Sequence, residues 1–156
     1  MWVVSLFSFV MLAGYLVASA RRYGVPDMVS DTFYQWKGRG WLFTLAMAWT
    51  DIPMMVCMLD SERGMQPLAF LGCLGLLFVG FSPNYFDKDE YVIHKGGAAA
   101  AAVGCVGWCV TVNPAPTVAV AVLYALRVLA ERPHPWYWAE VAAFADVFLT
   151  YWWMFL

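Results

Sequence analysis

Six apolar stretches, separated by short polar segments, run through this chain of 156 residues. They cover residues 1–20, 40–59, 67–82, 91–112, 117–130 and 136–156, and spans of about 20 apolar residues are long enough to cross a bilayer. Because backbone groups in lipid must find hydrogen bonds within the chain, such spans form helices. We therefore predict an all-α fold, a polytopic transmembrane bundle of six helices in a single domain, residues 1–156.

The composition agrees with a membrane environment and excludes one class of partner. Hydrophobic residues make up 63% of the chain and charged residues 13%, against roughly 25% charged residues in soluble domains. A net charge of -2 offers no basic surface, so nucleic acid is not expected to bind. Membrane lipid is the expected partner. All four cysteines lie in apolar stretches, where we expect small buried hydrophobes.

The basic residues predict the orientation of the bundle. Of the nine Lys and Arg residues, only Arg63 belongs to the second or fourth connection between spans. The other eight lie in or near the first, third and fifth connections: Arg21, Arg22, Lys37, Arg39, Lys88, Lys95, Arg127 and Arg132. Since basic residues stay in the cytoplasm, we predict both termini outside it. Short loops and the absence of a targeting sequence favour a bacterial inner membrane.

The first stretch has a second interpretation. Ala18, Ser19 and Ala20 resemble the cleavage site of a signal peptide. However, no basic residue precedes the apolar run, while Arg21 and Arg22 follow it. We therefore favour a retained helix.

The span 91–112 carries small residues at helical spacing. Gly96, Ala100 and Gly104 recur every four residues, and such a stripe lets two helices approach closely. We expect this helix to be the most buried of the bundle. The alternatives are a contact with a second copy or another helical partner, or a wall that leaves space for a lipid chain.

Three acidic residues, Asp51, Glu140 and Asp146, lie within apolar stretches and are costly in lipid. Asp51 follows Thr50 and precedes Pro53 by two positions. It predicts a proton or cation site, or equally a neutral carboxyl bonded to a neighbouring helix. Asp146 lies in the last span, six residues after Glu140, so the two carboxyls point to different faces of that helix.

Four polar residues share the side of the membrane that holds the basic connections. They are Ser30 and Asp31 in the first connection, His94 at the start of the fourth span, and Glu140 at the start of the sixth. Carboxylate and imidazole groups can run acid and base chemistry or hold Zn²⁺. Each also has a structural interpretation: helix capping for Ser30 or Asp31, an interfacial hydrogen bond for His94, and the favourable dipole of a helix N-terminus for Glu140.

The same residues resemble short motifs of other multispan membrane proteins. Ser30 and Asp31 after a first span, His94 before an alanine-rich run, and the string Trp138 to Val141 resemble small, uncharacterised multispan proteins of gut bacteria and their mobile elements. They are also similar to the CREST superfamily of membrane hydrolases, which includes alkaline ceramidases and adiponectin receptors. That resemblance implies a zinc site near the cytoplasm that touches Asp31 and His94. Because the chain has two histidines, the implied ligands are Asp31, His94 and Glu140.

Three functions follow as hypotheses, and whether the chain is an enzyme stays open among them. The most specific is a lipid-directed membrane hydrolase, with or without zinc, that uses Ser30, Asp31, His94 and Glu140. The second is a small transporter or channel component that uses Asp51 and Asp146. The third is a structural or regulatory membrane protein without catalysis.

Overall fold

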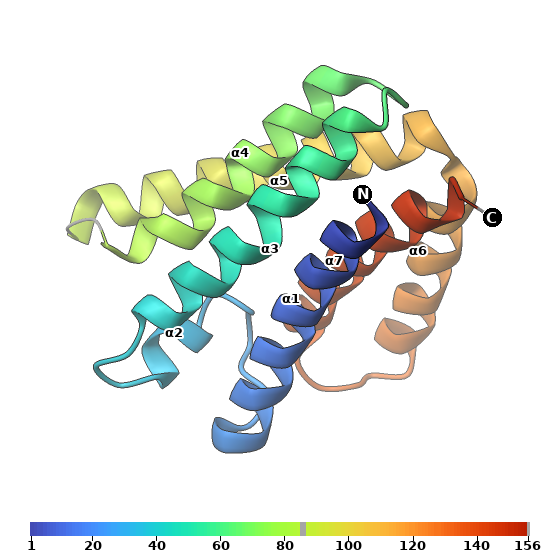
Figure 1. The fold of residues 1–156 in the computed structure, drawn as a ribbon. Coiled ribbons are helices and arrows are strands. Elements are labelled where there is room, and N and C mark those ends of the chain that lie inside the picture. The colour runs from blue at the N-terminus through green and yellow to red at the C-terminus, as the bar shows by residue number, and fades with distance from the viewer. Residues whose placement is uncertain (85–86, 156) are drawn as a thin grey trace.

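A computed structural model describes residues 1–84 and 87–155 of the chain. Side chains are described for residues 1–83 and 92–155. The elements follow in the order α1 (Trp2–Tyr23), α2 (Thr32–Gln35), α3 (Trp41–Asp60), α4 (Gln66–Phe81), a 3₁₀ turn η1 (Ser82–Asn84), α5 (Asp87–Val112), α6 (Pro114–Leu129) and α7 (Pro135–Trp153). Figure 1 shows them as a bundle of helices. No strand occurs in the described ranges, so the predicted all-α class is confirmed.

Each predicted span coincides with one long helix, whose limits differ by a few residues. The largest difference is at α5, which begins at Asp87 instead of residue 91. The polar run that follows η1 therefore forms the first turn of a helix, where we expected a loop. Lys88, which counts in the orientation argument, falls in this turn, and its side chain lies outside the described residues.

Among the described residues, three helices are long and apolar enough to cross a membrane. They are α1, α3 and the segment Val92–Val112 of α5. The apolar helices α4 and α6 have 16 residues each, which is about 24 Å at 1.5 Å per residue. This is less than the roughly 30 Å hydrocarbon core of a bilayer.

Helices α4 and α5 pack with their backbones in contact. A Cβ atom added to Gly104 would lie 2.3 Å from the backbone nitrogen of Gly72, and one added to Gly75 would lie 2.5 Å from the backbone nitrogen of Ala101. The small residues of α5 thus face α4 of the same chain, as close helix packing requires. Gly96, in contrast, has nothing near its Cβ position.

The most buried helix is α3, not α5. A larger share of the apolar window of α3 is buried than of the corresponding window in α5, which corrects the expectation from the small-residue stripe. Helix α3 packs extensively against both α1 and α4, whereas the contacts of α5 are concentrated on α4, with fewer to α6 and α7, so more of the α5 surface stays open. Three of the cysteines are buried and Cys105 is partly so, and all four are free thiols.

Helix α1 belongs to the folded bundle. The Ser8 hydroxyl donates to the carbonyl of Thr50 in α3, one residue after the carbonyl that Pro53 leaves without its helical donor. At the same end of the bundle, the rings of Trp2 and Trp152 stack with centroids 6.2 Å apart. The two termini therefore lie together, opposite the α1–α3 and α6–α7 connections (Figure 1).

Candidate functional site

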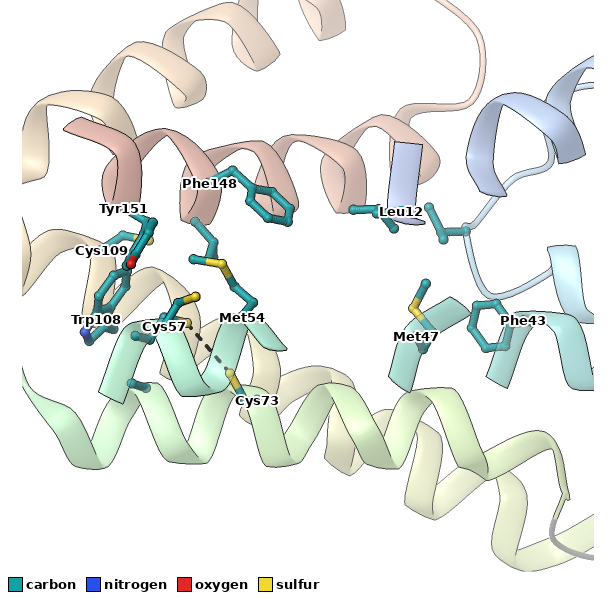
Figure 2. Close-up of a cluster of buried hydrophobic side chains, with 14 of the residues drawn as sticks. Leu12, Phe43, Met47, Met54, Cys57, Cys73, Trp108, Cys109, Phe148 and Tyr151 are labelled. Atoms are coloured by element: carbon teal, nitrogen blue, oxygen red, sulfur yellow. Dashed lines mark hydrogen bonds between the residues drawn. The ribbon is translucent and has the colours of Figure 1, made fainter. Parts of the chain in front are cut away.

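A cavity of about 150 Å³ lies between α3, α4, α5 and α7, with the segment before α2 at one end. Its wall is largely apolar and includes Met47, Met54, Met58, Cys73, Val106 and Phe148. Figure 2 shows Met54 and Phe148 in the space between α3 and α7. The Cys73 thiol donates to the sulfur of Met58 at 3.8 Å, across the α3–α4 contact (Figure 2). An apolar cavity of this size can hold a small hydrophobic molecule.

Four of the six polar residues singled out in the sequence line this cavity. Ser30 comes from the connection before α2, Asp51 from α3, His94 from α5 and Glu140 from α7. We call Ser30, His94 and Glu140 the polar end of the cavity, since Glu140 bonds to Val29 next to Ser30; on α3, the cavity wall begins at Phe43. Asp51 lies eight residues further along α3, or roughly 12 Å at 1.5 Å per residue.

Glu140 fixes the polar end by holding the first connection against α7. Its Oε2 atom accepts a hydrogen bond from the backbone N–H of Val29 at 2.5 Å. A second contact joins the same two regions, since His134 Nδ1 lies 3.1 Å from Asp27 Oδ1. The loop that carries Ser30 is therefore bound to the start of α7 at two points.

His94 is positioned by Ser82, the first residue of η1. Their Oγ and Nδ1 atoms are 3.1 Å apart, and the Ser82 hydroxyl also donates to the carbonyl of Val79 at 3.0 Å. A hydroxyl has a single proton. Because Ser82 directs that proton at Val79, Nδ1 of His94 is assigned as the donor in this contact.

Asp31 does not join the other candidates. Its Oδ2 atom accepts from the backbone N–H of Met28 at 3.0 Å, within its own turn, and it is not among the residues that line the cavity. The two neighbours Ser30 and Asp31 thus have different surroundings, because successive residues of a turn point in different directions.

The predicted zinc ligands do not form a coordination site. Within residues 1–84 and 87–155, no group of three His, Cys, Asp or Glu side chains is close enough to hold a metal ion. Asp31, the expected third ligand beside His94 and Glu140, is bonded to Met28 instead. The donor set therefore does not fit zinc.

Asp51 and Thr50 each bury a side-chain oxygen that has no hydrogen-bond partner, although the Cys73 thiol interacts with the Asp51 carboxyl. Both side chains are 2% exposed, and neither Oδ2 of Asp51 nor Oγ1 of Thr50 has a partner. Buried polar atoms in folded proteins are nearly always bonded, so a cavity wall with two unsatisfied oxygens needs an explanation.

Asp146, the other carboxyl within an apolar stretch, has a structural environment. Its Oδ1 atom accepts from the hydroxyls of Thr117 at 3.0 Å and Thr150 at 3.3 Å, and the side chain is 3% exposed. Since Thr117 lies on α6 and Asp146 on α7, this carboxyl joins the last two helices. It does not line the cavity.

Some residues of the site were missed in the sequence. Ser82 ends an apolar stretch and precedes a proline, so it has no sequence signal apart from its place near a helix end. The methionines of the cavity wall were missed because Met47, Met54 and Met58 are ordinary core residues in any apolar helix.

Comparison of the chain with protein-family models, with curated proteins and with solved structures finds no match.

Proposed function

We propose that this protein is an integral membrane protein of a bacterial inner membrane, in which α1 and α3 to α7 all cross the bilayer and both termini lie outside the cytoplasm. Support comes from the three helices of sufficient length and hydropathy and from large apolar side chains exposed on the others, such as Leu123 and Leu129 on α6. The shorter helices α4 and α6 cross where the bundle locally thins the bilayer. The basic residues of the α1–α3 and α6–α7 connections give the orientation.

We further propose that the protein hydrolyses a membrane amphiphile at the polar end of the cavity. One observation carries this proposal: Ser30, His94 and Glu140, from three separate segments, line a single cavity whose remaining wall is largely apolar. Convergent polar groups in an apolar pocket are typical of ligand sites. The reaction class is also the one that the resemblance to membrane hydrolases implies.

The residues present suffice for hydrolysis of an ester or amide by water. Glu140 accepts a proton from water as the water oxygen bonds to the carbonyl carbon. Ser30 donates a hydrogen bond to the carbonyl oxygen, where negative charge develops. His94 in its protonated form gives a proton to the leaving group as the bond to the carbonyl carbon breaks, and the proton taken up by Glu140 then passes through solvent to His94. The products are a carboxylic acid and an alcohol or amine, and no metal takes part in these steps.

A chromogenic ester tests this reaction. In detergent-purified protein, we expect wild type to release 4-nitrophenol from 4-nitrophenyl octanoate, and Glu140→Gln to lower kcat by about 100-fold or more. The glutamine can still accept the Val29 N–H bond, so the fold is retained. Glu131→Gln changes an exposed carboxylate of the α6–α7 connection and serves as the matched control. Equal rates for wild type and Glu140→Gln would reject the proposal.

A further inference from the structure

The centre of the cavity holds two polar side chains that the proposed reaction does not use. Asp51 and Thr50 both line the cavity, are nearly inaccessible from outside and have side-chain oxygens without a hydrogen-bond partner. Asp51 is two helical turns from Phe43, where the cavity wall begins on α3. It therefore forms a separate point of polarity within an otherwise apolar wall.

Nothing in the cavity wall neutralises Asp51. The residues that line the cavity include no Lys or Arg. The one residue of the wall that can carry a positive charge, His94, lies at the polar end and bonds to Ser82. The contact between Asp27 and His134 lies at the end of the bundle, away from Asp51. A buried carboxyl of this kind in a membrane protein indicates a bound partner.

The surroundings of Asp51 select the chemistry of that partner. Ca²⁺ and Mg²⁺ take six or more oxygen ligands, whereas the wall around Asp51 adds the Thr50 hydroxyl and the Cys73 and Cys105 thiols, and no group of three metal-binding side chains occurs among the described residues. Met47 and Met54, one helical turn to either side, instead present apolar surface to the cavity. A partner must thus combine hydrogen-bond donors or a positive charge with a hydrocarbon body.

We infer that Asp51 and Thr50 bind the ammonium group of an alkylamine whose chain lies against the methionines of the cavity wall. The ammonium supplies three N–H donors, which satisfy the Asp51 carboxylate and the Thr50 hydroxyl together. A charge-assisted bond of this kind is strong where water is excluded. The inference rests on one part of the proposed function, namely that an amphiphile enters the cavity. It restricts this amphiphile to one that carries an amine.

Three probes with the same chain and different head groups test the inference. We expect the detergent-purified full chain to bind octylamine at least about 10-fold more tightly than octanol and to bind octanoate more weakly than either. Isothermal titration calorimetry in maltoside micelles gives the affinities, and native mass spectrometry gives one bound amine per chain. Octylamine bound no more tightly than octanol would overturn the inference, and this comparison needs no variant.

Variants locate the amine. Asp51→Asn keeps the shape and removes the charge, so we expect the preference for octylamine over octanol to disappear; Thr50→Val should reduce it by a few fold. Asp146→Asn, a buried carboxyl away from the cavity, is the matched control and should keep the preference. A preference that survives Asp51→Asn would overturn the assignment to this carboxyl.

The two proposals fail separately. Octylamine binding with no release of 4-nitrophenol from the ester rejects the hydrolysis and supports the amine site. Ester hydrolysis without a preference for octylamine rejects the amine site and supports the reaction at the polar end.

Discussion

At the scale of single residues, Glu140 has two tasks at once. Its carboxyl lines the cavity and accepts the Val29 N–H bond that holds the first connection. A carboxylate has two oxygens and several acceptor positions, so one oxygen can hold the loop while the other faces the cavity. Substitutions that keep the bond to Val29 therefore separate the chemistry from the fold.

For Asp31, in contrast to Glu140, we predict that substitution has little effect on ester hydrolysis. Because its carboxyl bonds to Met28 within a turn, Asp31→Asn should keep that bond through the amide oxygen. We expect ester hydrolysis by this variant to stay within about 3-fold of wild type, against the much larger loss for a group that transfers a proton. The same chromogenic assay measures it. A 100-fold lower rate of ester hydrolysis would instead indicate that Asp31 takes part in the reaction.

The bond between Thr117 and Asp146 predicts a stability effect. Thr117→Val removes the shorter of the two hydrogen bonds to this carboxyl, and leaving a buried acceptor without a donor costs about 1–3 kcal/mol. We expect a lower thermal midpoint in detergent for Thr117→Val and a nearly unchanged one for Thr117→Ser, which keeps the hydroxyl. Equal midpoints for the two variants would contradict a structural role for this contact.

The sequence was informative about polar residues and silent about their directions. In a chain this apolar, Ser30, His94 and Glu140 stand out because each has a cost in lipid, and the structure lines one cavity with all three. Asp31 was grouped with them because its connection lies on the same predicted side of the membrane and because the resemblance to membrane hydrolases includes it. Direction depends on the turn that carries a residue, and the Met28 bond that orients Asp31 could not be inferred from residue types.

At the scale of helices, the α4–α5 contact makes a sharp comparison between two glycines of one helix. Gly104→Ala places a methyl group against the Gly72 backbone, and overpacking of this kind costs about 1–3 kcal/mol. Gly96→Ala meets nothing within 4 Å and replaces a poor helix former. We expect thermal unfolding in detergent to show a loss for the first variant and none for the second. Similar midpoints would mean that α4 and α5 are less close.

The helices were predictable because the apolar runs end at polar or proline-rich segments, such as Asn113 before α6, whose side chain accepts from Ala115 N–H at 3.0 Å. The relative burial of the helices, in contrast, could not be predicted from the sequence. A stripe of small residues such as Gly104 shows that a helix approaches a neighbour closely, yet it does not say how the rest of the helix surface is covered. Helix α3 packs extensively against two helices, whereas α5 packs mainly against α4, and this distribution of contacts depends on the arrangement of the whole bundle.

At the scale of the whole molecule, the proposed orientation predicts which residues a reagent outside the cell can reach. With both termini outside, a cysteine introduced by Arg63→Cys in the α3–α4 turn should react with a membrane-impermeant maleimide in spheroplasts. Cysteines from Arg39→Cys and Glu131→Cys should react only after lysis. The native cysteines are largely buried and give a low background. Reaction of all three variants before lysis would contradict the orientation.

The contact between the two ends of the chain has a consequence for biosynthesis. The Trp152 indole donates to the Ser5 hydroxyl at 3.1 Å, so the segment around Ser5 acquires this neighbour only after 147 further residues have been synthesised. Until then, the flank of α1 that Trp152 covers faces lipid or a chaperone. A ribosome stalled before α7 would hold a nascent bundle with an open seam, a target for membrane proteases that the finished protein no longer presents.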